Sequence, residues 1–267
     1  MSISPEMALD DQTGPFWQER DPEQLAFLAS PWPTAIILAT YLLFVLKVGP
    51  WLMADRKPFN LRGFIKTYNI LQIIYNGSIV VSTSYILFVR RPYKLSCPIT
   101  MPLDHELKDV ERLISNAYTI NKFVDLVETV IFVLRKKDRQ VSFLHIFHHI
   151  SMVLYVYLYT TLNGPGGPSA PMMLMNVIVH TIMYTYYFLS SISPAVQASL
   201  WWKKYITIAQ LIQFGGLMVF CIQMLAQSDC QAPRFVSYVI GALSASFTVM
   251  FGKFYYRTYV VNNQKKV

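Results

Sequence analysis

Residues 34–54 read TAIILATYLLFVLKVGPWLMA, a run interrupted by one charged residue, Lys47. A helix needs about 20 mostly apolar residues to cross the hydrocarbon core of a bilayer. Six further segments of similar length follow, although the third and fourth carry charges and histidines. The chain is therefore predicted to be an all-α integral membrane protein with seven transmembrane helices, at residues 34–54, 65–88, 117–135, 141–160, 170–190, 205–226 and 235–256.

The composition favours a bilayer over water as the solvent. Of 267 residues, 54% are hydrophobic and 14% are charged, against roughly 25% charged in soluble domains. We expect a polar N-terminal segment (1–33), a membrane domain (34–258) and a basic tail (259–267). The first segment lacks the basic start and short apolar run of a signal peptide. Basic residues cap the spans and form no aromatic-interleaved patch, which argues against nucleic-acid binding.

The distribution of lysine and arginine orients the spans, because cytosolic loops are enriched in these residues. With the N-terminus outside or in a lumen, the cytosolic side holds fourteen: Arg56, Lys57, Arg62, Lys66, Arg135, Lys136, Lys137, Arg139, Lys203, Lys204, Lys253, Arg257, Lys265 and Lys266. The opposite side holds seven: Arg20, Arg90, Arg91, Lys94, Lys108, Arg112 and Arg234. The sequence therefore predicts an N-out, C-in arrangement.

Two of the three cysteines, Cys97 and Cys230, fall on the non-cytosolic side in this arrangement, and Cys221 lies within the sixth span. If that side is an oxidising lumen, a bridge between Cys97 and Cys230 can form. Two free thiols are the alternative.

The fourth span carries the strongest indication of chemistry. His145, His148 and His149 lie at positions i, i+3 and i+4, so one helix face presents all three. A second polar stripe follows on the next span: Asn176, His180, Tyr184 and Tyr187. Ionisable residues inside membranes are rare and usually functional. The alternative is that these groups only bond neighbouring helices.

The third span places Lys122, Asp125 and Glu128 at intervals of three residues. Each charge near a bilayer centre costs about 2.5–3.5 kcal/mol on insertion scales, so partners are expected. Lys122 can pair with Asp125, which leaves Glu128 in need of a donor, and a histidine of the adjacent helix is the obvious one. A structural ion pair that locks helices together and a catalytic role are both consistent with this pattern.

The sixth span presents Thr207, Gln210 and Gln213 on one face, which would add to a polar interior. Basic residues at the cytosolic ends of the spans could meet phosphate groups as point charges. The candidates are Lys203, Lys204, Arg135, Lys136 and Lys137. Ordinary positive-inside topology would also account for them.

Four motifs together resemble one family. Residues 140–149, QVSFLHIFHH, resemble the histidine box of the very-long-chain fatty acid elongases, and residues 176–187, NVIVHTIMYTYY, resemble that family's next motif. A third match is Thr207-x-x-Gln210-x-x-Gln213-Phe214. The segment from Lys122 matches the family pattern K-x-x-E-x-x-D-T with its two acids exchanged.

The resemblance implies a seven-helix enzyme of the endoplasmic reticulum, with its N-terminus in the lumen, its C-terminus in the cytosol and an acyl-chain tunnel between the helices. It implies condensation of a long-chain acyl-CoA with malonyl-CoA to a 3-ketoacyl-CoA, CO₂ and CoA, with no metal or other cofactor. Partners would be the other enzymes of the elongation cycle, and a homodimer is left open. The tail residues Lys265 and Lys266 stand one position out of register with the family's dilysine retrieval signal.

Our hypothesis is that His148 takes the acyl group as an acyl-imidazole, because no cysteine lies beside the histidine box and histidine can form covalent intermediates. His180 would help to bind or polarise the second substrate. His145 and His149 would orient the box and donate to the enolate oxygen that develops. Asp125 or Glu128 would fix histidine tautomers, and Asn176 could add a donor. A ternary mechanism without an acyl-enzyme remains open.

Two other classes share some of these features. A membrane di-iron desaturase or hydroxylase also carries an HxxHH motif but needs many more histidines than the five present here. A receptor or transporter would fit the number of spans, yet no inverted repeat is visible and the clustering of histidine with carboxylate, asparagine and tyrosine favours catalysis.

Overall fold

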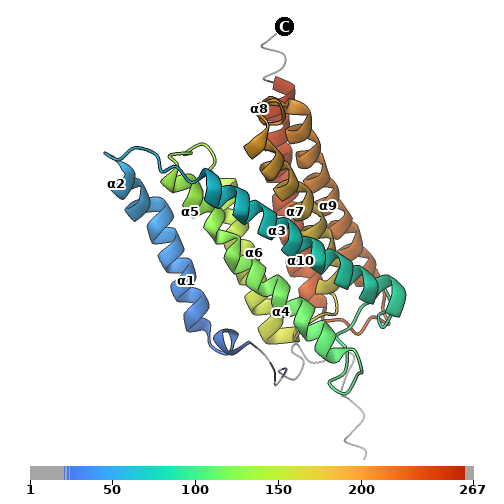
Figure 1. Cartoon of the computed structure of the whole chain (residues 1–267). Coiled ribbons are helices and arrows are strands. Elements are labelled where there is room, and N and C mark those ends of the chain that lie inside the picture. Colours follow the sequence, from blue (N-terminus) through green and yellow to red (C-terminus); the bar gives the residue numbers. More distant parts are fainter. Residues whose placement is uncertain (1–20, 22, 24, 262–267) are drawn as a thin grey trace, which may run out of the picture.

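The computed structural model describes Asp21, Glu23 and residues 25–261. Over these residues the chain forms helices and no strand (Figure 1). Lys265 and Lys266 of the expected retrieval signal lie outside the described residues, as does Arg20.

The helical elements follow the chain as a series of long rods joined by short loops. They are η1 (Ala26–Leu28, 3₁₀), α1 (Pro31–Leu43), η2 (Phe44–Val48, π-helical), α2 (Gly49–Met53), α3 (Arg62–Ser84), η3 (Tyr85–Arg90, π-helical), α4 (Lys108–Val124), α5 (Leu126–Leu134), α6 (Phe143–Asn163), α7 (Ser169–Ile192), α8 (Pro194–Ala198), α9 (Leu200–Ala226), α10 (Arg234–Tyr255) and η4 (Tyr256–Val261, π-helical).

Five of these rods are long and apolar enough to cross a membrane: Pro31–Met53, Arg62–Arg90, Ser169–Ile192, Leu200–Ala226 and Arg234–Val261. Side chains on their outer faces are strongly apolar and exposed, as with Trp51 (75%), Val81 (69%) and Ile212 (66%). Apolar surface of this extent on the outside of a helical bundle is suited to lipid rather than water. The chain is a multi-pass, all-helical membrane protein.

The rod formed by α4 and α5, which corresponds to the third predicted span, departs from the boundaries expected for it. It begins at Lys108 rather than at residue 117, and it is divided into α4 and α5 at Asp125. The added turns are highly charged, but their charges pair along the helix: Lys108 Nζ lies 2.9 Å from Glu111 Oε2, and Arg112 Nη1 lies 2.8 Å from Asp109 Oδ1. These charges lower the mean hydropathy of the segment, which is why the span was expected to begin later. The expected boundary was wrong, because the helix already begins at Lys108.

The other rods match the expected spans with shifted ends. α9 begins at Leu200 rather than at residue 205, and α6 runs to Asn163 rather than to residue 160. The last helix does not stop at residue 256 but continues as η4 through Val261, into the expected basic tail.

The core lies between α3, α4, α6, α7, α9 and α10, where the largest buried cluster includes Tyr118, Val177, Phe214 and Ile240. The first rod (Pro31–Met53) packs beside this core, against α5 and α6. Its residues Tyr41 and Val45 lie in one buried cluster with Val133 of α5. In Figure 1 it forms the outer edge of the bundle. The histidine box on α6 is therefore covered on one side by the first rod and on the other by α7 and α10.

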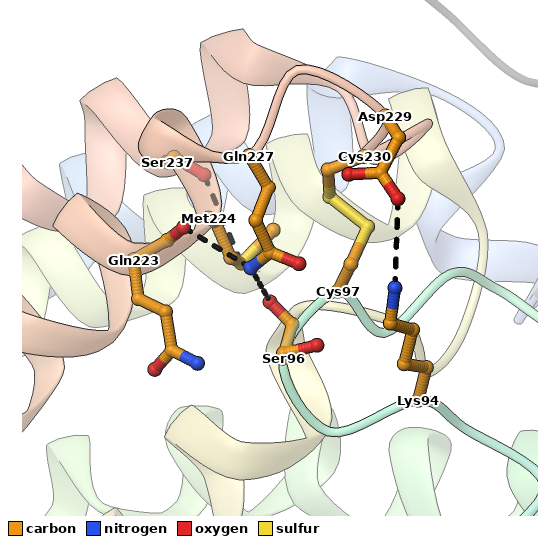
Figure 2. The surroundings of a disulfide bond; sticks show 9 residues. All are labelled: Lys94, Ser96, Cys97, Gln223, Met224, Gln227, Asp229, Cys230 and Ser237. Carbon is orange, nitrogen blue, oxygen red and sulfur yellow. Dashed lines mark hydrogen bonds and ion pairs between the residues drawn. A yellow bond between two sulfur atoms is a disulfide. The ribbon is translucent and has the colours of Figure 1, made fainter.

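Because the rods alternate in direction, the loops gather at two ends (Figure 1). We call the end with residues 54–61, 135–142, 193–199 and the end of η4 the basic end. The opposite end holds residues 91–107, 164–168 and 227–233, and we call it the disulfide end. Cys97 and Cys230 form a disulfide there (Figure 2). Gln227 Nε2 also donates to Ser96 O at 2.8 Å, so the segment after η3 is tied to the α9–α10 turn.

A buried ionic cluster at the disulfide end holds Asp21 against α4. Arg112 Nε donates to both oxygens of Asp21 at 3.0 Å, and Lys108 Nζ lies 3.7 Å from Asp21 Oδ2. Burial opposes ionisation of Asp21, but the hydrogen bond and positive charge of Arg112 hold the pKa of its carboxyl below the usual value. Asp21 therefore remains charged at neutral pH.

Candidate active site

The histidine box lies in the first two turns of α6, at the basic end. Ser142 caps this helix, because its Oγ accepts from the backbone N of His145 at 3.3 Å. The rings of His145 and His149 have centroids 4.3 Å apart, and those of His148 and His149 are 5.5 Å apart. Across from α6, the His180 ring of α7 faces His148 at 6.4 Å in a nearly parallel arrangement. Two helices therefore bring four imidazoles together.

Asp125 anchors the His180 side of the site. Its carboxylate lies at the break between α4 and α5 and is 2% exposed. Oδ2 accepts from Lys122 Nζ at 2.8 Å and lies 3.6 Å from His180 Nδ1. Oδ1 accepts from Tyr184 OH at 2.9 Å. The expected Lys122–Asp125 pair is thus present, and the same carboxylate also faces a histidine.

Glu128 and Thr129 support the other side of the box. Glu128 Oε2 lies 3.9 Å from His149 Nε2, while Glu128 Oε1 has no hydrogen-bond partner among the described residues. Thr129 Oγ1 lies 2.9 Å from His145 Nε2 and accepts from Tyr41 OH at 2.9 Å. Glu128 and Thr129 therefore each face an imidazole, and Tyr41 holds Thr129 from behind.

Asn176 lines the cavity and contacts Lys122, the partner of Asp125. Its Oδ1 accepts from Lys122 Nζ at 2.9 Å and from Tyr118 OH at 3.3 Å. Both lone pairs of this oxygen are then used, which leaves the amide NH₂ as the group that can face a ligand.

A cavity of about 430 Å³ opens beside these groups. Predicted site residues of α5, α6 and α7 line it, among them Glu128, His145, His148, His149, Asn176 and His180. Tyr187, Gln210 and Gln213 also line it, as do Phe214 and Phe251. Arg139, Lys203 and Tyr259 line its side toward the basic end. The cavity thus combines convergent polar groups with apolar walls, as ligand sites commonly do.

Several predicted residues lie away from the cavity wall. Lys122, Asp125 and Tyr184 are buried behind it and contact the lining residues instead. Four of the phosphate candidates are not among the lining residues: Lys204, Arg135, Lys136 and Lys137. Lys136 Nζ donates to Ala54 O at 2.9 Å. Arg139, which the sequence analysis did not single out for phosphate binding, lines the cavity in their place.

A polar stripe on α3, which was not predicted from the sequence, also supports the site. Gln72 Nε2 donates to Asp125 Oδ1 at 3.0 Å and to Tyr68 OH at 3.1 Å. The signal was available, since Asn69, Gln72 and Asn76 recur at helical spacing within an otherwise apolar span. Tyr41, which reaches the box through Thr129, gave no comparable signal because tyrosine is common in membrane helices.

Glu128, His145 and His149 could hold a metal ion, because their donor atoms lie within 4.8 Å of one another. Zinc binds nitrogen and oxygen at about 2.0–2.2 Å in tetrahedral geometry, which places ligands of one ion roughly 3.4 Å apart. These donors would have to move closer to share an ion, and His145 Nε2 is already beside Thr129 Oγ1.

Comparisons with known proteins identify the family of the chain. The family model described as "ELO: GNS1/SUR4 family" matches residues 26–267. Very long chain fatty acid elongase F of Drosophila melanogaster is 54% identical over 245 residues, which cover 92% of this chain and 95% of the relative. Very long chain fatty acid elongase 1 of Homo sapiens is 38% identical over 243 residues, covering 87% and 83%. The chain therefore belongs to the ELO (GNS1/SUR4) family.

Proposed function

We propose that this protein is a fatty acid elongation enzyme that condenses a long-chain acyl-CoA with malonyl-CoA. The products are a 3-ketoacyl-CoA, CO₂ and CoA, as in the first step of an elongation cycle. The observation that carries the proposal is the facing pair His148 and His180 on one cavity, with Asp125 behind His180 and apolar walls beyond. The names of the relatives, which are fatty acid elongases, point to the same reaction class.

In the first half-reaction, a ring nitrogen of His148 attacks the thioester carbonyl of the acyl-CoA. A C–N bond forms, the C–S bond breaks, and the proton of the other ring nitrogen passes to the CoA thiolate that leaves. The acyl-imidazole splits a difficult condensation into two easier steps. An apolar neighbour would slow its hydrolysis, because the His148 ring packs against Phe247 with centroids 5.1 Å apart.

In the second half-reaction, malonyl-CoA loses CO₂, and the electron pair of the broken C–C bond forms an enolate. The enolate carbon attacks the acyl carbonyl, the C–N bond to His148 breaks, and the ring regains a proton from water. This proton is the one that the overall reaction consumes. The developing oxygen charge needs preorganised donors, and the Asn176 amide and His149 are the candidates on the cavity wall.

We further propose that α4–α5 and α6 also cross the bilayer, which gives seven transmembrane helices in an endoplasmic reticulum membrane. Their polar groups turn inward, toward the cavity, as expected of charged residues within a membrane domain. The acyl chain would extend into a tunnel past Phe214, and Lys203 and Arg139 would receive CoA phosphates at the mouth. No metal enters this mechanism, and the 3-ketoacyl-CoA product would pass to reducing and dehydrating enzymes of the cycle.

The test is incubation of purified protein with a panel of acyl-CoAs and labelled malonyl-CoA, beside His148→Ala. Labelled 3-ketoacyl-CoA is expected from the unmodified chain and not from the variant. Acyl-CoA alone should release CoA and leave an acyl mass on the peptide that contains His148. An adduct on another residue would overturn the assignment of His148, and CoA release only when malonyl-CoA is present would favour a ternary mechanism.

A further inference from the structure

A chain of buried side-chain amides ends on Asp125 without touching the cavity. Gln72 and Asn76 lie on α3 and Asn121 lies on α4, and their exposed fractions are 3%, 0% and 2%. None of the three is among the residues that line the cavity. Their contacts run in series, from Asn121 through Asn76 and Gln72 to the carboxylate.

The direction of every amide in this chain is fixed by the carboxylate at its end. Asp125 Oδ1 can only accept, so the Gln72 NH₂ must face it, at 3.0 Å. Gln72 Oε1 is then turned away and accepts from Asn76 Nδ2 at 3.2 Å. Asn76 Oδ1 accepts in turn from Asn121 Nδ2 at 3.0 Å. Reversing one amide would bring two acceptors or two donors together, which is costly in a buried site.

Oδ2, the second carboxylate oxygen of Asp125, connects this chain of amides to His180. Gln72 and Tyr184 together supply two donors to Oδ1, so rotation of the carboxylate would break both bonds. Oδ2 is thereby held between Lys122 Nζ, at 2.8 Å, and His180 Nδ1, at 3.6 Å. His180 Nδ1 makes no hydrogen bond among the described residues, and Oδ2 is the charged oxygen nearest to it, so the field of the carboxylate favours the tautomer with its proton on Nδ1. Nε2 is then the basic nitrogen available to the cavity.

We propose that Gln72, Asn76 and Asn121 are positioning residues that set the orientation and tautomer of His180 through Asp125. The inference rests on the proposed condensing function. It assigns a role in that reaction to three side chains of α3 and α4 that do not line the substrate cavity. Buried partners of this kind in other enzymes change activity by roughly tenfold to a hundredfold when they are removed.

Gln72→Met tests the first link, because it removes the donor and keeps the volume. We expect kcat to fall roughly tenfold or more while KM for malonyl-CoA changes less than about twofold. Asn121→Leu removes the last donor of the chain and should lower kcat in the same direction by a smaller factor, because Asn76 Nδ2 also donates to Gln72 O at 2.8 Å. Activity is measured on the full chain in detergent with long-chain acyl-CoA and labelled malonyl-CoA.

Gln72→Glu supplies a readout that a purely structural role would not move. A carboxyl group at this position can donate to Asp125 only when it is protonated, and once ionised it repels Asp125. We therefore expect the kcat of this variant to rise as the pH is lowered, on a limb that is missing from the pH profile of the unmodified chain.

Asn69→Met is the matched control, since Asn69 is a buried amide on the same helix whose Nδ2 has no hydrogen-bond partner among the described residues. Its kcat should stay within about twofold of the unmodified value. The inference is overturned if Gln72→Met also stays within twofold, if Asn69→Met loses as much, or if the Gln72→Glu profile overlays that of the unmodified chain. An unmodified chain that makes no 3-ketoacyl-CoA would instead defeat the proposed function, and the inference with it.

Discussion

Two adjacent histidines of α6 have different surroundings, and their proposed roles follow from that difference. His148 points toward His180 and Phe247, with ring centroids 6.4 and 5.1 Å away, and it forms an ion pair with none of the carboxylates in the described part of the chain. His149 instead lies between His145 and Glu128, and its ring is 5% exposed. A nucleophile needs an open approach from the cavity, whereas an orienting group needs fixed neighbours. His148 satisfies the first requirement and His149 the second.

The same surroundings predict how the enzyme responds to metal chelators. Glu128, His145 and His149 are assigned here to orienting the box, so removal of divalent metal should leave kcat unchanged within about twofold. Condensation is measured after dialysis against a strong chelator, with metal content followed by mass spectrometry. Loss of activity that zinc or iron restores would show that these three groups hold a metal, and the roles given to His145 and His149 would then be wrong.

At the scale of the element, the break between α4 and α5 decides which carboxylate serves which histidine. Asp125 lies at the break and serves His180, while Glu128 lies one turn later and faces His149. The family pattern carries these two acids in the opposite order. In this chain the shorter acid occupies the more crowded position, where Lys122, Gln72 and Tyr184 all donate to it at 2.8–3.0 Å.

The exchange can be tested by restoring the family order. Asp125→Glu alone adds a methylene to a filled, buried site and should lower kcat at least tenfold, because the carboxylate can no longer keep its place beside His180. Overpacking of this kind also costs about 1–3 kcal/mol of folding stability. Glu128→Asp added to it should recover part of the loss, because contacting residues commonly couple by 0.5–3 kcal/mol. The measurement is a double-mutant cycle on kcat. Strictly additive losses would mean that the two acids act independently.

Comparing the predicted helices with the observed ones shows which features of this protein can be predicted from sequence patterns. The histidine box and the stripe from Asn176 could be predicted, because ionisable groups stand out against an apolar helix. The start of the third rod could not, since Lys108, Glu111 and Arg112 lower the hydropathy although their charges are neutralised within the folded cluster. The hydrogen bond from Gln72 to Asp125 was not predicted, for a related reason. Uncharged amides look like ordinary helix contacts until the structure places one of them against Asp125.

At the scale of the whole molecule, the two ends differ in charge and in chemistry, and both differences indicate the same orientation. Basic loops and the cavity residues Arg139 and Lys203 lie at one end, and the Cys97–Cys230 disulfide lies at the other. Disulfides persist in oxidising compartments, while acyl-CoA and malonyl-CoA carry phosphates that basic residues can meet. We therefore predict that the disulfide end faces the lumen and the cavity mouth faces the cytosol.

Engineered glycosylation acceptors test this orientation directly, because only lumenal sites are modified. A short acceptor loop inserted after Leu103, which is 49% exposed, should be glycosylated in microsomes. The same loop inserted after Asp138, at the basic end, should not be. Retained condensing activity shows that each insertion variant still folds. Modification at residue 138 and not at residue 103 would invert the topology: the disulfide would then face the reducing cytosol, and the basic residues at the cavity mouth would face the lumen.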